Sequence, residues 1–166
     1  MAMITVECSG RFPVGFSQED AVRLVRLALR IADGAQPHEA PPQAGRSGAT
    51  VNLSLVSDRD IRSLNRRYRG LNQPTDVLSF GYSRSHPAVA AVGRGRKLER
   101  QLGDIVVSTE TARRSAKINQ RTLKAELALL MVHGCLHLLG FDHDTQAKEN
   151  RMFCLQQDIL SKAGIL

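Results

Sequence analysis

Three histidines are the residues whose spacing most clearly indicates chemistry. His133 and His137 are four residues apart in the segment Leu123–Leu139, which is apolar on nearly every side and is predicted to be a buried central helix. About one helical turn separates them, so both imidazoles project from the same face and can chelate one ion. Gly140 is predicted to end the helix, and the sharp turn that glycine allows can bring His143 back as a third ligand.

Three neutral imidazoles leave a fourth coordination position open for water, which is typical of a catalytic metal site and not of a structural one. The donor set favours zinc, one ion per chain, although imidazoles also suit nickel, copper and iron. The alternative is that the histidines are ordinary core residues. Burying three unpaired imidazoles in a leucine-rich helix would be costly, and this favours metal binding.

The same spacing occurs in the metallopeptidase motif HExxHxxGxxH, but Gly134 stands at the position of its general-base glutamate. The general base that ordinary peptide hydrolysis needs is therefore absent. A metallopeptidase-like hydrolase is kept only as an alternative function. Asp142 precedes the third histidine. It is predicted either to orient a ligand or water from behind the coordination shell, or to cap the turn.

A second cluster of candidate residues is basic. The segment 64–80 reads LNRRYRGLNQPTDVLSF, in which Arg66, Arg67 and Arg69 follow a predicted short helix and precede a predicted strand. Arginines there can bind phosphate groups through paired hydrogen bonds. Cations also suit the solvated carboxyl end of a helix because of its dipole, so charge alone does not decide between these interpretations.

The composition indicates which classes of partner and which cellular compartment suit the protein. The formal charge of +7 favours polyanionic partners such as nucleic acid, although it can equally serve solubility. No segment is apolar for long enough to span a membrane, and the opening residues do not form a secretory signal. Three widely spaced cysteines, Cys8, Cys135 and Cys154, are predicted to be buried thiols in a reducing compartment, and we therefore expect a cytoplasmic protein.

The 166 residues suit one domain, residues 1–166, with two flexible loops predicted at 34–48 and 81–101. Alternating apolar residues predict strands, and capping residues followed by helical periodicity predict helices. The predicted strands are Ile4–Cys8, Val51–Val56, Val77–Phe80 and Gly103–Ser108. The predicted helices start after Ser17, Ser57, Ser108 or Thr109, and Thr122, and a last helix spans roughly Ala147–Lys162.

Three sequence blocks resemble one known family. HGCLHLLGFDH at 133–143, the 64–80 segment and LGDIVVS at 102–108 are similar to the YbeY family of bacterial single-strand endoribonucleases, and they follow in family order. The resemblance implies an α+β fold, a single domain in which a mixed four-stranded sheet packs with helices around the central helix. It also implies that His133, His137 and His143 hold zinc, and that Arg69 lies in the same cleft.

The resemblance further implies a zinc-dependent endoribonuclease that acts on single-stranded RNA in ribosomal RNA maturation, at the 3′ end of 16S rRNA, and in ribosome quality control. The implied partners are rRNA and the ribosome or small-subunit proteins, with no membrane. We expect Arg69 and His133 to be catalytic, with Arg69 stabilising charge on the phosphate. The alternative is a non-catalytic RNA- or ribosome-binding protein with a structural zinc.

Electrostatic RNA contacts are also predicted away from the histidines, at Arg113, Arg114 and Lys117 or on the basic 81–101 loop. Two tyrosines and five phenylalanines leave little scope for an aromatic stacking platform. The chain departs from the family pattern at Asn72 and Gln156, where acidic residues are common, and at Gly81, where proline is usual. We expect none of these three departures to touch a metal ligand.

Overall fold

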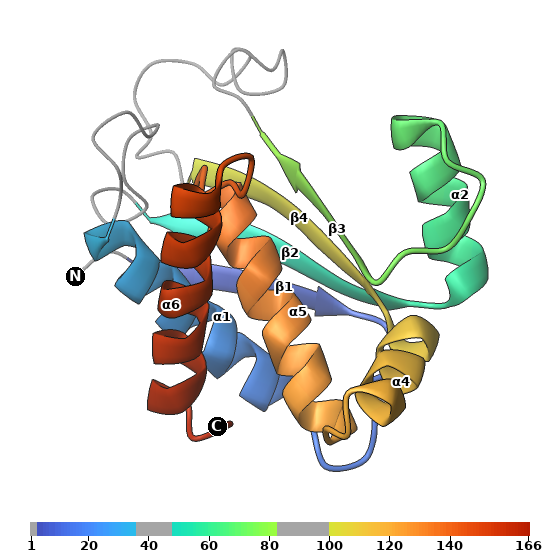
Figure 1. Ribbon diagram of the computed structural model, residues 1–166, viewed down its shortest axis with the longest axis horizontal. Helices are drawn as coiled ribbons and strands as arrows, with labels where there is room; N and C mark the ends of the chain where they lie inside the picture. Colours follow the sequence, from blue (N-terminus) through green and yellow to red (C-terminus); the bar gives the residue numbers. More distant parts are fainter. Residues whose placement is uncertain (1–2, 36–47, 83–99) are drawn as a thin grey trace.

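The computed structural model of the protein describes residues 3–35, 48–82 and 100–166 (Figure 1). They form a single α+β domain with a mixed four-stranded sheet, so the predicted fold class is confirmed. The strands are β1 (Ile4–Ser9), β2 (Ala49–Val56), β3 (Val77–Gly81) and β4 (Arg100–Ser108). The helices are α1 (Gln18–Gly34), α2 (Asp58–Arg69), α4 (Thr109–Ile118), α5 (Leu123–Leu138) and α6 (Gln146–Lys162).

The strand order in the described sheet is β1-β2-β4-β3, which makes β3 an edge strand. β1 pairs parallel to β2 and β2 pairs parallel to β4, whereas β3 runs antiparallel to β4. Residues at matching register positions form rows across the sheet. One such row consists of Glu7, Asn52, Asp104 and Phe80, one residue from each strand.

Helices α1, α5 and α6 cover one face of the sheet (Figure 1). The strands contribute alternate side chains to this core, such as Val51, Leu53 and Leu55 of β2, because successive strand residues point to opposite faces. Helix α5 contacts the sheet as well as α1 and α6, which explains why it is apolar on nearly every side. The helix that carries two of the histidines is therefore held in place by the main core.

Helix α2 packs on the other face of the sheet, over β3 and β4, through a small apolar cluster of Ile61, Leu78 and Val106. Gly70 ends the helix in a left-handed conformation with φ of 73°, which glycine adopts without steric cost. The buried Asn65 side chain donates a hydrogen bond to the Gln73 carbonyl (2.8 Å). These interactions turn the chain back from α2 into β3, so the end of α2 lies beside the edge strand.

The capping residues behave as the sequence predicts. Ser17, Ser57, Ser108 and Thr122 are the N-caps of α1, α2, α4 and α5, and each side chain accepts a hydrogen bond from the backbone N–H three residues later. Thr145 caps α6. Local side-chain hydrogen bonds therefore fix where the helices start.

Two predicted strand boundaries are wrong. β2 begins at Ala49 and β4 at Arg100, because these ends pair with each other: Ala49 lies opposite Arg100 and Thr50 lies opposite Gln101. Pairing between distant segments leaves no local pattern in the sequence. The predicted 81–101 loop thus loses residues to β3 and β4. Residues 83–99 of this loop and 36–47 of the predicted 34–48 loop lie outside the described residues.

The cysteines match the prediction only in part. Cys135 is buried in α5, Cys8 is half-buried and Cys154 is exposed, so the prediction of a buried thiol is wrong for Cys154. All three are free thiols. None of the helices in the described ranges has the length and hydropathy needed to cross a membrane.

Candidate metal centre and its cavity

Helix α5 places His133 and His137 side by side near its carboxyl end. Their Nε2 atoms lie 3.0 Å apart, and their rings meet edge to face with centroids 4.6 Å apart. Leu136 and Leu138, on the same turns, are buried and hold this part of the helix against the core. The spacing of four residues therefore brings the two imidazoles together.

His143 lies on the loop that follows α5. Gly140 has a left-handed φ of 85°, and the backbone N–H of the buried Phe141 donates a hydrogen bond to the Leu136 carbonyl (3.0 Å). The Asp142 carboxylate accepts a hydrogen bond from the His143 backbone N–H (2.8 Å), which matches the capping interpretation of Asp142. The loop consequently returns to the helix, and ligand atoms of the three histidines all lie within 4.8 Å of one another.

The surroundings keep the two imidazoles on α5 neutral. Burial is the main cause that lowers the pKa of His133 and of His137, and the neighbouring imidazoles lower both further. A hydrogen bond with the Gln156 side chain opposes the shift of the His133 pKa. Because metal ions bind neutral imidazole, these shifts favour metal binding at neutral pH.

The donor set fits a divalent metal ion. Three imidazoles are a known ligand set of catalytic zinc, with zinc–nitrogen distances of about 2.0–2.1 Å. Tetrahedral ligands at that distance lie about 3.3 Å apart, which is close to the 3.0 Å between the His133 and His137 Nε2 atoms. His143 is exposed on its loop and has room to adjust. The three residues together can hold one ion.

The histidines open into a cavity of about 630 Å³ along the edge strand β3. Arg69, at the end of α2, lines this histidine cavity together with the three histidines, and Asp76, just before β3, lines it too. The Asp76 carboxylate accepts a hydrogen bond from the Val77 backbone N–H (2.8 Å). A guanidinium beside a three-histidine metal site is suited to binding and hydrolysing a phosphate ester.

Gly134, which replaces the metallopeptidase glutamate, faces the sheet. A Cβ atom at this position would lie 2.8 Å from Ile105 Cγ2 and 3.1 Å from Ser79 Oγ, closer than ordinary van der Waals contact. Helix α5 can approach β3 and β4 this closely only with glycine here. A glutamate would displace the helix, so the geometry disfavours a peptidase mechanism of that type.

Comparison with known proteins leads to one family. The sequence pattern of the family described as Endoribonuclease YbeY matches residues 16–164. The chain belongs to the YbeY family. The endoribonuclease YbeY of Moorella thermoacetica is 42% identical over 168 residues, covering 96% of this chain and 99% of that protein. That of Bacillus subtilis is 38% identical over 151 residues and covers 91% of each chain.

A solved structure supports the fold. The solution structure of a Thermotoga maritima protein matches with a TM-score of 0.58 and 24% identity, covering 97% of this chain and 89% of that one. At this identity the match supports the architecture alone. The YbeY family assignment rests on the sequence comparisons.

The predicted RNA-contacting residues are dispersed. Arg66 and Arg67 lie in the exposed last turn of α2, and the Arg67 guanidinium lies 5.5 Å from the centre of the Tyr68 ring. A separate cavity of about 330 Å³, the α4 cavity, is lined by Asp58, Glu110, Arg113, Arg114 and Lys117. Of the six basic residues predicted to contact RNA, Arg69 is the one that lines the histidine cavity.

One departure from the family pattern touches a predicted metal ligand. Asn72 accepts a hydrogen bond from Arg62 Nε (3.0 Å), whereas Gln156, buried on α6, hydrogen-bonds the imidazole of His133. The expectation that no departure contacts a ligand is therefore wrong for Gln156. A partner on an imidazole fixes its tautomer and ring orientation. Helical periodicity can place Gln156 on a buried face, but no sequence signal pairs it with His133.

Proposed function

We propose that the protein is a metal-dependent endoribonuclease that cleaves single-stranded RNA in the histidine cavity. The convergence of three imidazoles and the Arg69 guanidinium on this one cavity carries the proposal. Two relatives that match most of the chain are named as endoribonucleases. The formal charge of +7 favours a polyanionic substrate.

In this proposal His133, His137 and His143 hold one zinc ion. When bound, the ion polarises a phosphate oxygen and brings the pKa of water towards about 7. Arg69 binds the scissile phosphate and stabilises the charge that develops on it, so Arg69 and the ligand His133 belong to the catalytic group. Asp142 keeps His143 in place through its hydrogen bond to the backbone.

We further propose that the RNA substrate is ribosomal, with the 3′ end of 16S rRNA as the processing site and a second task in ribosome quality control. A role on the ribosome or beside small-subunit proteins is what the resemblance of the three sequence blocks implies. Three free cysteines fit a reducing cytoplasm. Arg66, Arg67, Arg113, Arg114 and Lys117 would then add electrostatic contacts to the RNA backbone.

The competing function is a non-catalytic RNA-binding protein whose zinc only supports the fold. Two observations favour catalysis. Three protein ligands leave a coordination position for water or substrate, whereas structural zinc sites are usually closed by four protein ligands. His133 and His137 are also only partly buried and His143 is exposed, whereas the buried apolar core is formed by other residues of α5, α1, α6 and the sheet.

The test is cleavage of an end-labelled single-stranded RNA, with zinc content measured on the same samples. We expect the wild type to cut, His137→Ala to lose both metal and cutting, and Arg69→Ala to keep metal but cut poorly. Arg59→Ala, which removes the same charge from an exposed position on α2, is the matched control. A metal-loaded wild type that binds RNA without cutting it would favour the binding protein.

A further inference from the structure

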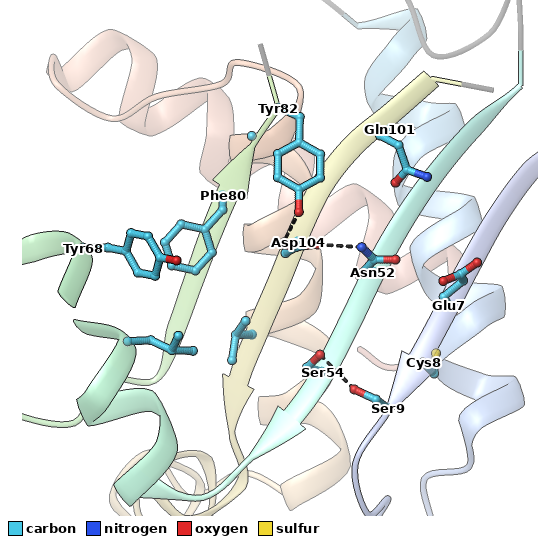
Figure 2. Close-up of a pocket in the computed structure, with 13 residues that line it drawn as sticks. Glu7, Cys8, Ser9, Asn52, Ser54, Tyr68, Phe80, Tyr82, Gln101 and Asp104 are labelled. Carbon is cyan, nitrogen blue, oxygen red and sulfur yellow. Dashed lines mark hydrogen bonds between the residues drawn. The ribbon is translucent and has the colours of Figure 1, made fainter. Parts of the chain in front are cut away.

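A second cavity, of about 1000 Å³, lies on the face of the sheet opposite α5 (Figure 2). The row of Glu7, Asn52, Asp104 and Phe80 crosses its floor from β1 to β3. Side chains at such facing positions have Cβ atoms about 5 Å apart. Among the described helices, α2 covers only the part of this face above β3 and β4. In the polar remainder of the row, Glu7 is exposed and Asn52 and Asp104 are partly exposed.

Two aromatic side chains line both this sheet-face cavity and the histidine cavity. Phe80 comes from β3 and Tyr68 from α2, and their ring centroids lie 4.9 Å apart at an interplanar angle of 57° (Figure 2). Tyr68 is 57% exposed although its ring is large and apolar. The sequence suggested little scope for a stacking platform, yet the fold brings two of the few aromatic residues together beside the metal ligands.

The charges in the sheet-face cavity exclude a phosphate but suit a nucleobase. The Glu7 and Asp104 carboxylates would repel the RNA backbone, whereas a base is uncharged and offers hydrogen-bond donors. Asp104 accepts hydrogen bonds from Asn52 Nδ2 (2.7 Å) and from the Tyr82 hydroxyl (2.5 Å). An ionised carboxylate has about four acceptor positions, so Asp104 can accept further hydrogen bonds.

Two donors hold the Asp104 carboxylate in place. The hydrogen bond to Asp104 is the largest cause that raises the pKa of Tyr82 to about 12, so the Tyr82 hydroxyl keeps its proton at neutral pH. Asn52 and Tyr82 each donate a hydrogen bond to the carboxylate, and together they fix its position beside Phe80. An oriented acceptor next to an aromatic ring can bind both the edge and the flat face of a base.

We propose that the sheet-face cavity is a subsite for one base of the RNA, which stacks on Tyr68 and Phe80 and directs its amino group to Asp104. This rests on the proposed function, because the phosphate beside that base would lie in the histidine cavity. Two arginines lie near the expected path of the RNA backbone. Arg69 lines the histidine cavity, and the Arg67 guanidinium lies near the Tyr68 ring. Guanine, adenine and cytosine carry an exocyclic amino group, whereas uracil offers only its ring N–H, so the subsite favours the amino-bearing bases over uracil.

The test uses short oligo(A), oligo(C) and oligo(U), with affinity measured by fluorescence anisotropy and cleavage measured as kcat and KM. Tyr68→Leu should raise KM and Kd about tenfold and leave kcat near the wild-type value, because stacking is lost. Asp104→Asn should bring the preference for oligo(A) and oligo(C) over oligo(U) close to one. Phe153→Leu, at an aromatic residue of α6 that is 58% exposed, is the matched control and should behave as wild type.

The outcomes separate this inference from the proposed function. Wild-type affinities in Tyr68→Leu, or an unchanged base preference in Asp104→Asn, would overturn the subsite even if RNA is cut. Unchanged RNA binding in both variants is also the result expected if a protein occupied this face. If the wild type binds RNA through Tyr68 and prefers amino-bearing bases through Asp104 but cuts nothing, the subsite stands as an RNA-binding site and the nuclease proposal fails.

Discussion

The histidine cavity and the α4 cavity are both lined by arginines that the sequence predicts to contact RNA, but these arginines have different neighbours in the two cavities. Arg69 lines its cavity together with His133, His137 and His143, the proposed metal ligands. Arg114 pairs with Asp58 at 2.7 Å and donates a hydrogen bond to Thr111 (2.7 Å). The partner of an arginine, and not its contribution to the net charge, decides whether it is available for a phosphate.

The largest expected difference between the two cavities is in catalysis. Arg69→Ala should lower kcat/KM for RNA cleavage by about 10²-fold, because a donor to the transition-state charge is lost. Arg114→Ala should lower it by less than about threefold, since Asp58 already pairs with the Arg114 guanidinium. Parallel kinetics on metal-loaded samples check this, and equal losses in the two variants would break the distinction.

The next effect concerns metal affinity, which should change in the histidine cavity and not in the α4 cavity. Gln156→Leu removes the hydrogen-bond partner of His133 and should weaken zinc binding by about 10–100-fold. Competition with a fluorescent chelator measures this. Gln157→Leu, at the adjacent half-buried position on α6, is the control and should bind zinc as the wild type does. Equal zinc affinities in all three proteins would show that Gln156 does not support the site.

The α4 cavity should matter for stability. The Asp58 carboxylate accepts hydrogen bonds from Ser108 (2.5 Å) and Thr111 (2.7 Å) in addition to its ion pair with Arg114. Asp58→Asn should therefore lower the free energy of unfolding by about 1–3 kcal/mol at pH 7, while the folded variant still cleaves RNA. Denaturant unfolding measures this, with Asp158→Asn at an exposed ion pair as the control.

The same variant has a predictable pH dependence. Burial acts to raise the pKa of Asp58, but the hydrogen bonds from Ser108, Thr111 and Arg114 together lower it. A carboxylate with a lowered pKa stabilises the fold fully above its unfolded pKa, about 4, and loses this effect as the pH falls through the folded value. The stability difference between wild type and Asp58→Asn should shrink below about pH 4. A difference that is constant with pH would contradict the role of the charge.

The smallest expected effect is electrostatic. Arg113→Ala and Lys117→Ala remove exposed cations of the α4 cavity, and each should weaken RNA binding only a few-fold. If these residues contact phosphates, each variant should also reduce the slope of log Kd against log salt concentration by about 0.7 for a single strand. Unchanged slopes would show that these residues of α4 do not contact RNA phosphates.

Local sequence patterns predicted the features that depend on local geometry. The spacing of His133 and His137 and the glycine at 140 describe one helix end, so the ligand cluster could be read from a short segment. The helix caps at Ser17 and Thr122 are equally local. Such features need no knowledge of which distant segments pair.

Features that depend on distant pairing were missed. Gln156 meets His133 only after α6 packs on α5, and the pairing of Asp58 with Arg114 joins residues from two helices. The early start of β4 depends in the same way on its register with β2. The row from Glu7 to Phe80 exists only because four strands align in one register. Tertiary packing determines these contacts, and no periodicity within one segment encodes them.

The most direct test of the catalytic metal is its removal and return. Wild-type protein is treated with a chelator, its fold is followed by circular dichroism, and RNA cleavage is measured before and after zinc is added back. Because His133 and His137 are only partly buried and His143 is exposed, we expect a folded, inactive protein that regains cleavage with zinc. Cleavage that continues without metal, or a loss of cleavage that only follows unfolding, would contradict a catalytic ion at His133, His137 and His143.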